Sequence, residues 1–241
     1  MGLVETIIKK VLEKGIILTK TKISDSVYKI QIKSDAVINY DFVPGHFLRL
    51  GVGIDQDEIS LKDKVRSYSV WDINKENSTI AIAIATHSKG IGTKWVETCK
   101  PNDTVYFKWK KGKFLVDDSA DSYLMIGDLS ALSHLYIISR NLSDNKQIES
   151  IIYSENMDDF FLDITGAKPF DFYEMSQNPS NAIIEKLEGI IPKLKGNTMV
   201  YIAGDSRVCV ALTNYFRKEL NWATKQIKTK PFWNPDKKGL E

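Results

Sequence analysis

The hydrophobic period of this sequence changes once, near Phe114, and the change restricts the folds open to the chain. Before it, apolar residues recur at a period of two, most strictly over 79–85, where isoleucine alternates with alanine. Short alternating segments predict a small antiparallel barrel, for which we expect six strands. After it, strand segments alternate with helical segments, which predicts a parallel α/β sheet. We therefore expect a β-barrel domain of residues 1–116 and an α/β domain of residues 117–241, divided at the polar run 117–121.

Individual segments can be assigned within this plan. Residues 3–14 have the apolar period of an amphipathic helix that ends at Gly15, and residues 72–78 have the composition of a turn. Residues 156–180 show no clear period. In the second half, strands are expected at 122–127, 147–154, 198–203 and 225–230, and helices at about 129–141, 181–191 and 206–220.

Composition excludes several classes of protein. A net charge of +2 over 241 residues lacks the basic excess of a nucleic-acid binder. Cys99 and Cys209 lie far apart, and with three histidines they form no zinc-ligand pattern, so no metal is expected. No apolar run reaches membrane-spanning length, and the first residues lack the basic start and apolar core of a signal peptide. We expect a cytoplasmic protein that acts as a monomer.

The segment 65–71 holds the most distinctive group of side chains in the first half. Arg66 is one of five arginines in the chain, and its guanidinium presents a fixed fork of donors that fits phosphate oxygens. Tyr68 offers a flat face and a hydroxyl, while Ser67 and Ser69 are small polar neighbours. Together they suit a ligand with a diphosphate at one end and a planar polar ring at the other. The alternative is an ordinary strand with a solvated arginine.

A glycine-rich turn follows the strand 79–85 and opens a short helical segment. His87, Gly90, Gly92, Thr93 and Lys94 lie at this helix start, where free backbone amides favour an anion and glycine allows close approach. An ordinary strand-to-helix turn explains the same pattern equally well.

Two strand-to-helix junctions of the second half carry a Gly-Asp pair. They are Gly127-Asp128, followed by Ser130, and Ala203-Gly204-Asp205, followed by Arg207. Ligands of open parallel sheets bind beyond the carboxyl ends of the strands, which is where both pairs are expected. A turn with a helix cap is the alternative for each pair taken singly.

In this order, the segments resemble the ferredoxin-reductase-type flavoproteins, and within them the siderophore-interacting proteins, which are FAD-dependent ferric-siderophore reductases. The resemblance covers nearly the whole chain. It rests on residues 44–50, 66–69, 87, 90–95, 127–132, 203–207 and 231–233.

The resemblance implies a role for each group. Arg66, Ser67, Tyr68 and Ser69 would hold the FAD diphosphate, ribityl chain and ring. His87, Gly90, Gly92, Thr93 and Lys94 would lie near the diphosphate and adenine. The two Gly-Asp junctions, with Ser130, Ala203 and Arg207, would line the site for NADPH or NADH, and Arg207 favours the 2′-phosphate of NADPH. Trp233 would lie near the flavin and shape the substrate pocket.

The sequence lacks one arginine that the family uses to bind its anionic substrate. The family has an arginine after its late aromatic-Trp pair, whereas Asn234 follows Trp233 here. Ferric catecholates are polyanions, so a cationic pocket is expected, and Lys110, Lys111 and Lys113 are the nearest replacement in type. A solvated lysine run is the alternative.

The expected function is the reduction of a ferric siderophore, of catecholate or mixed type, by NAD(P)H through FAD. Two alternatives stay open. One is a flavin oxidoreductase that takes electrons from a ferredoxin-type partner, and the other is a protein that binds a siderophore or another anion without turnover.

Overall fold

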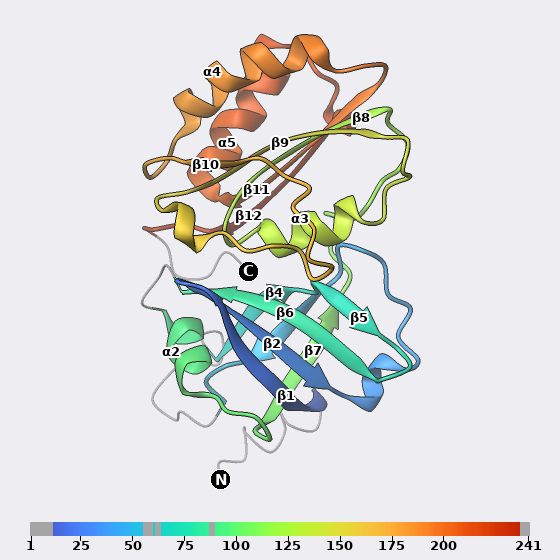
Figure 1. The fold of residues 1–241 in the computed structure, drawn as a ribbon, viewed down its shortest axis with the longest axis vertical. Helices are drawn as coiled ribbons and strands as arrows, with labels where there is room; N and C mark the ends of the chain where they lie inside the picture. The colour runs from blue at the N-terminus through green and yellow to red at the C-terminus, as the bar shows by residue number, and fades with distance from the viewer. Residues whose placement is uncertain (1–11, 55–59, 61–63, 87–89, 237–241) are drawn as a thin grey trace. The chain divides into compact units, whose positions relative to one another are not determined.

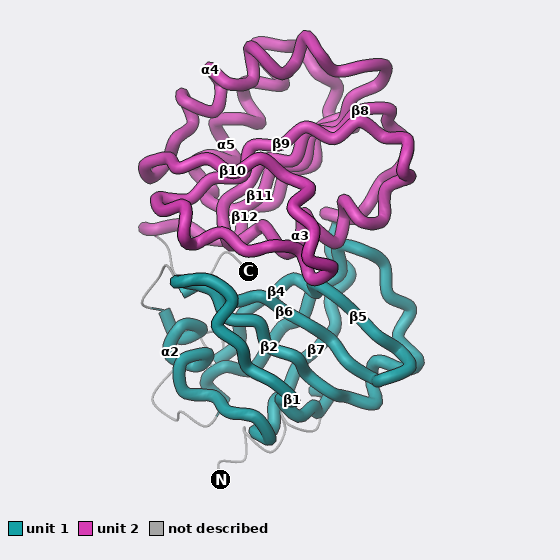
Figure 2. Tube along the Cα trace, viewed as in Figure 1, with its two compact units in different colours: residues 1–113, 241 teal, residues 114–240 magenta. Residues whose placement is uncertain are grey.

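The structure is a computed structural model that describes residues 12–54, 60, 64–86 and 90–236. It divides into two compact units, one up to Lys113 and the other from Phe114 onward (Figure 2).

The first unit is an antiparallel sheet with one short helix (Figure 1). Its strand order is β4-β3-β7-β1-β2-β6-β5. The elements are β1 (Glu13–Ser24), β2 (Val27–Lys33), β3 (Phe47–Gly51), β4 (Val65–Ser69), β5 (Asp72–Asn74), β6 (Thr79–Ala85), α2 (Ile91–Thr98) and β7 (Thr104–Lys110).

One bent segment joins the two edges of this sheet. β4 pairs with β3, whereas β5, two residues later, pairs with β6. Between them, Val70 N donates to His46 O (3.3 Å) on one side, and Trp71 N donates to Ala81 O (2.8 Å) on the other. The chain therefore changes partner at Val70-Trp71 and closes the sheet into a barrel, as predicted. Counted as one bent strand, β4 and β5 give the six strands expected, although the predicted turn 72–78 is wrong over Asp72–Asn74.

The start of the barrel also corrects a prediction. Most of the predicted helix 3–14 lies outside the described residues, but Glu13 and Lys14 belong to β1, where they pair with Phe107 and Tyr106. Gly15 continues the strand instead of ending a helix. A Cβ at this position would lie 2.6 Å from the Ile32 side chain and 3.0 Å from a backbone oxygen, so the barrel needs glycine here.

The second unit is a parallel sheet of order β10-β9-β8-β11-β12 with helices on it (Figure 1). Its strands are β8 (Ser122–Asp128), β9 (Gln147–Ser154), β10 (Phe172–Glu174), β11 (Thr198–Asp205) and β12 (Ile227–Trp233). Its helices are α3 (Leu132–Ser139), α4 (Ser180–Ile190) and α5 (Ser206–Asn214), which a π-helical turn, Tyr215–Glu219, extends. β10 was not predicted, because three residues are too few to show a period.

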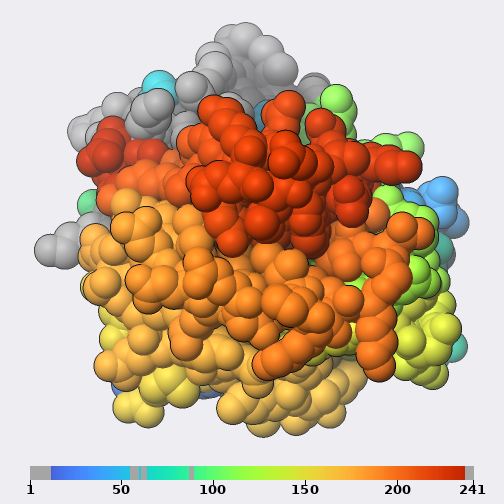
Figure 3. Space-filling model, turned by 90° about the horizontal axis from the view of Figure 1, so that it is seen from above, coloured from blue at the N-terminus to red at the C-terminus, as the bar shows by residue number. Residues whose placement is uncertain are grey.

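Alternate residues of the central strands pack against different layers. Leu124, Ile126, Val200 and Ile202 form one core with side chains of α4 and α5. On the other face, Phe114 packs edge-on against Tyr201 and against His134 of α3. Figure 3 shows one face of this unit, where the orange and red residues of its C-terminal half predominate. Within the described ranges, no helix is both long and apolar enough to cross a membrane.

The histidine of α3 makes the stability of the second unit depend on pH. His134 is fully buried, its Nε2 lies 3.0 Å from Phe114 O, and burial lowers its pKa from 6.5 to about 3. The unfolded chain therefore binds a proton that the folded chain does not, and stability falls as pH drops from about 6.5 towards 3.

We expect the free energy of unfolding of the second unit to be about 2 kcal/mol lower at pH 5 than at pH 7 because of this group. Urea unfolding at both pH values measures it. His134→Gln keeps a donor for Phe114 O and should remove most of the difference. An unchanged pH dependence in that variant would assign the effect to other groups.

Candidate functional site

The side chains of the predicted flavin residues in β4 lie on the two faces of the strand. Arg66 and Tyr68 lie opposite Leu50 and Leu48 of β3, whose side chains are fully buried, so they start on the core side of the barrel. Ser67 and the buried Ser69 lie on the other face. Arg66 Nη1 donates to the carbonyl of its own neighbour, Val65 (2.6 Å), which holds the guanidinium close to the strand.

The start of α2 lies against this pair. A Cβ on Gly92 would be 2.1 Å from the Tyr68 hydroxyl and 3.9 Å from Arg66 Cγ, so only a residue without a side chain fits. Gly90 is the N-cap of α2 and makes no side-chain cap, Thr93 is buried, and Lys94 is exposed. The structure thus brings together Arg66, Tyr68 and the first turn of α2, whereas His87 lies outside the described residues.

These donors fit FAD. A guanidinium, the amides of a helix N-terminal turn whose N-cap is a glycine, and a hydroxyl are groups that proteins use for a diphosphate. Tyr68 adds an aromatic face within contact of the same turn. The cradle at Gly92, which a Cβ would fill, supports the same assignment.

Gly92→Ala is expected to lower the affinity for FAD by about tenfold, because its Cβ must displace the Tyr68 hydroxyl, a contact worth about 1–2 kcal/mol. Flavin fluorescence on dilution measures the affinity. Gly189→Ala is the matched control, since it adds the same methyl group to helix α4 at a site with no atom within 4 Å. Equal flavin affinities in the two variants would contradict the assignment of Tyr68.

In the second unit, the strands that follow β8 in the chain lie on both sides of it. From β8 the chain runs to β9 and β10 on one side, while β11 and β12 lie on the other side of β8. The crevice beyond the carboxyl ends of β8 and β11 is therefore the expected ligand site. Gly127-Asp128 and Gly204-Asp205 end these two strands, as predicted.

The Asp128 carboxylate joins three strand ends. Its Oδ1 accepts hydrogen bonds from Ser130 N (2.9 Å) and Ser130 Oγ (2.5 Å). Its Oδ2 accepts from Asp205 N (2.7 Å) at the end of β11 and from Trp233 Nε1 (2.8 Å) at the end of β12. The side chain is buried, so these four donors compensate for the lost hydration of its charge. Asp128 is thus a structural clamp, which sequence reasoning did not foresee.

Gly204 makes this clamp possible. Its φ of +118° is open mainly to glycine, and a Cβ would lie 2.3 Å from Asp128 Oδ2. The pairing of β11 with β12 shifts by one residue at this point, so that Asp205 lies opposite Trp233. This β-bulge places the Trp233 indole, a predicted flavin neighbour, at the same sheet edge as Asp128.

The Arg207 side chain is held by Asp205, two residues before it. Asp205 caps α5 by accepting from Arg207 N (2.9 Å), and it also accepts from Arg207 Nε (3.1 Å) and Nη2 (2.6 Å). Hydrogen bonding to Asp205 raises the pKa of the Arg207 guanidinium above its usual value. The predicted phosphate ligand therefore forms a forked ion pair inside the protein.

Tyr153 is a member of this edge that sequence reasoning missed. It lies on β9 directly opposite Asp128 and is buried, and within the described part of the chain its hydroxyl has no hydrogen-bond partner. Burial, and then the charge of Asp128, raise its pKa well above 10. The only sequence signal was its place at the end of a strand adjacent to a Gly-Asp junction.

The predicted substrate lysines lie at the end of β7. Lys110 is its last residue and is half-buried, whereas Lys111 and Lys113 are exposed. An aromatic group lies nearby: Tyr40 stacks on Trp109 with 3.8 Å between ring centres, and the Tyr40 hydroxyl lies 3.1 Å from His46 Nδ1. Burial, and then Lys111, lower the pKa of His46. Lys111 thus acts on a buried histidine, which the lysine pattern did not indicate.

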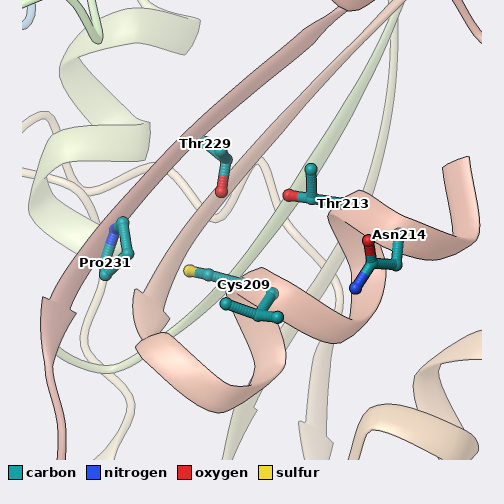
Figure 4. Close-up of a pocket in the computed structure, with 6 residues that line it drawn as sticks. Cys209, Thr213, Asn214, Thr229 and Pro231 are labelled. Atoms are coloured by element: carbon teal, nitrogen blue, oxygen red, sulfur yellow. The ribbon is translucent and has the colours of Figure 1, made fainter. Parts of the chain in front are cut away.

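A small pocket elsewhere in the second unit holds none of the predicted residues. It encloses about 190 Å³ between α5 and β12 and is lined by Cys209, Val210, Thr213, Asn214, Thr229 and Pro231 (Figure 4). Burial raises the pKa of the Cys209 thiol to about 12, so it is not a nucleophile at neutral pH. No group of three side chains able to hold a metal occurs in the described residues.

Two domain families match the chain in sequence. The oxidoreductase FAD-binding domain matches residues 14–115, which include β4 and α2, and the siderophore-interacting protein family matches residues 120–236, which include both Gly-Asp junctions. The chain joins an FAD-binding domain to a siderophore-interacting protein domain. The FAD-binding domain thus contains Arg66, Tyr68 and Gly92, and the siderophore-interacting domain contains the Asp128 clamp.

Solved structures show the same fold. The siderophore-interacting protein of Acinetobacter baumannii is 15% identical, with a TM-score of 0.77 over 93% of this chain and 91% of that one. The siderophore-interacting protein SipS of Aeromonas hydrophila is also 15% identical (TM-score 0.76; 94% and 93% covered). The ferredoxin-NADP+ reductase of Plasmodium falciparum is 15% identical (TM-score 0.69; 92% and 97% covered). No curated protein matches the chain. The chain therefore contains an oxidoreductase FAD-binding domain and has a ferredoxin-reductase-like fold.

Proposed function

We propose that this protein reduces ferric siderophores in the cytoplasm, with electrons from a nicotinamide dinucleotide, and releases Fe(II). The observation that carries the proposal is the match of residues 120–236 to the siderophore-interacting protein family, joined in one chain to an FAD-binding domain. Iron(II) is a poorer partner than iron(III) for hard oxygen ligands, so reduction loosens the chelate. The chain need only bind the reactants in order, and no general base is required.

The FAD-binding domain has the groups for the cofactor. Bound FAD supplies the redox chemistry, by taking electrons in pairs and passing them on singly. Arg66 and the amides of the first turn of α2 bind the diphosphate, with Gly90, Gly92, Thr93 and Lys94 forming that turn. Tyr68 contacts the planar ring system, with Ser67 and Ser69 as small polar neighbours. His87 and Trp233 complete the set of proposed flavin residues.

The siderophore-interacting domain binds the nicotinamide dinucleotide at its diverging sheet edge. Asp128 keeps the ends of β8, β11 and β12 in one arrangement, so these strand ends are ordered before the ligand binds. Gly127, Ala203 and Gly204 form the buried backbone of these strand ends, and Ser130, Asp205 and Arg207 complete the proposed set of residues.

The first experiment is the visible absorption spectrum of the purified protein, before and after NADH, NADPH and a ferric catecholate are added without oxygen. A flavin band that bleaches with a nicotinamide and recovers with the chelate supports the reductase. If only a reduced ferredoxin bleaches the flavin band, the electron donor is a ferredoxin-type protein and not a nicotinamide dinucleotide. Absence of a flavin band after incubation with FAD would refute the redox function and favour a siderophore-binding protein.

The lysines at the end of β7 give a test of substrate binding. Lys111→Ala with Lys113→Ala is expected to weaken binding of an anionic ferric catecholate by about tenfold and to leave a neutral chelate unaffected, because each exposed cation contributes up to about 1 kcal/mol. Fluorescence titration with both chelates measures it. Lys110 joins them in the proposed pocket.

The matched control is Lys33→Ala with Lys100→Ala. It removes the same charge at two exposed positions near the opposite end of β7. Lys33 pairs with Ile16 of β1, and Ile16 pairs with Thr104, the first residue of β7. Equal losses in both double variants would mean that net charge alone attracts the chelate.

A further inference from the structure

We propose that the electron donor is NADH. The carboxyl ends of β8, β9 and β11 in the siderophore-interacting domain, called the ligand edge below, reject the 2′-phosphate of NADPH. This inference rests on the proposed function, because it names the donor of that site. The two dinucleotides differ only in a phosphate of about −2 charge on the adenosine ribose. The charges at this edge therefore decide which of the two dinucleotides binds more tightly.

The arginine that the sequence offers for such a phosphate is already neutralised. Arg207 Nε and Nη2 both point to the Asp205 carboxylate, at 3.1 and 2.6 Å, and Asp236 adds a second negative charge nearby. A 2′-phosphate would have to compete with a carboxylate that is almost fully buried and has few other donors. Releasing Arg207 would leave that charge unpaired, which is costly.

The other two arginines of the described part of this domain do not replace it. Arg140 forms an ion pair with the buried Asp163. Arg217 lies in the π-helical turn that follows α5, at the far end of that helix from Ser206 and the ligand edge.

The strand next to β8 ends in negative charge. β9 lies one strand away, about 4.8 Å, and its carboxyl end continues into Glu155, Asp158 and Asp159. Glu155 and Asp158 are exposed, whereas Asp159 accepts a hydrogen bond from Ser154 Oγ (2.9 Å). Carboxylates accept hydrogen bonds from the two ribose hydroxyls of NADH but repel a phosphate at the same place.

The test compares the two dinucleotides on the FAD-loaded protein. Calorimetry gives the dissociation constants of NADH and NADPH, and of the unreactive probes 5′-ADP and 2′,5′-ADP. We expect the phosphate on the 2′ position to weaken binding by about tenfold, or about 1.4 kcal/mol, in both pairs. Flavin bleaching should follow the same order.

Two variants locate the cause. Glu155→Lys should narrow the preference for NADH, whereas Glu188→Lys, the same change of charge on α4, should not. Glu188 acts electrostatically on Tyr215, at the end of α5 remote from the ligand edge. Arg207→Ala should leave the ratio of the two affinities unchanged, since its guanidinium is committed to Asp205.

The outcomes separate this inference from the proposed function. Tighter binding of NADPH, or a loss of NADPH binding alone in Arg207→Ala, would overturn the inference and leave a nicotinamide-dependent reductase. Equal effects of Glu155→Lys and Glu188→Lys would also overturn it. If neither dinucleotide binds, the nicotinamide donor is wrong and the inference falls with it.

Discussion

Replacing Arg66 with alanine is expected to leave the purified protein without bound FAD. The Arg66 side chain starts beside Tyr68 and the first turn of α2, and charge-assisted bonds from its guanidinium to a diphosphate contribute about 1.5–3 kcal/mol each. Loss of two such bonds weakens binding by about 100-fold or more. The ratio of flavin to protein absorbance after gel filtration measures the occupancy.

Arg66→Lys is the control for this prediction. It keeps the charge but loses the planar fork, so an intermediate affinity is expected. Thermal unfolding of the apo forms of both variants shows whether any loss of flavin comes from a loss of the fold. Full flavin occupancy in Arg66→Ala would show that the diphosphate binds elsewhere.

Gly204→Ala is expected to lower the free energy of unfolding of the second unit by about 2–5 kcal/mol. The positive φ strains an alanine by about 1–3 kcal/mol, and its Cβ must push aside the Asp128 carboxylate, which has four hydrogen bonds to lose. The Trp233 indole would lose its acceptor. Urea unfolding measures the first effect, and a shift in tryptophan fluorescence reports the second.

Gly166→Ala provides the matched control. Gly166 also has a positive φ, +82°, but no atom lies within 4 Å of its Cβ position, so only backbone strain of about 1–2 kcal/mol is expected. The difference between the two variants isolates the contact with Asp128. If both variants lose the same stability, and tryptophan fluorescence does not change, the clamp contributes nothing measurable.

Local pattern was sufficient for the two-part architecture and for the face of β4 on which two of the proposed flavin residues lie. Alternation over 79–85 predicted β6, and the spacing of Arg66 and Tyr68 put them on the same face of β4, because side chains alternate along any strand. The same local reasoning was wrong for 72–78 and for Glu13 and Lys14. Their partners, Thr79–Ala81 and Tyr106–Phe107, are tertiary neighbours that no local pattern reveals.

Periodicity and the chemistry of turns are enough to predict a barrel followed by a parallel sheet, with Gly-Asp pairs at two strand ends. The roles of those residues depend on which strands pair in the folded protein. Asp128, Asp205 and Trp233 are brought together by the pairing of three strands, and the β-bulge after Gly204 sets which side chain faces which. Asp205 binds Arg207 locally, as the N-cap of α5, whereas Tyr153 lies opposite Asp128 because β8 pairs with β9. A carboxylate is a ligand or a clamp according to the donors around it, and two of the four donors to Asp128 lie on strand ends that only folding brings to it.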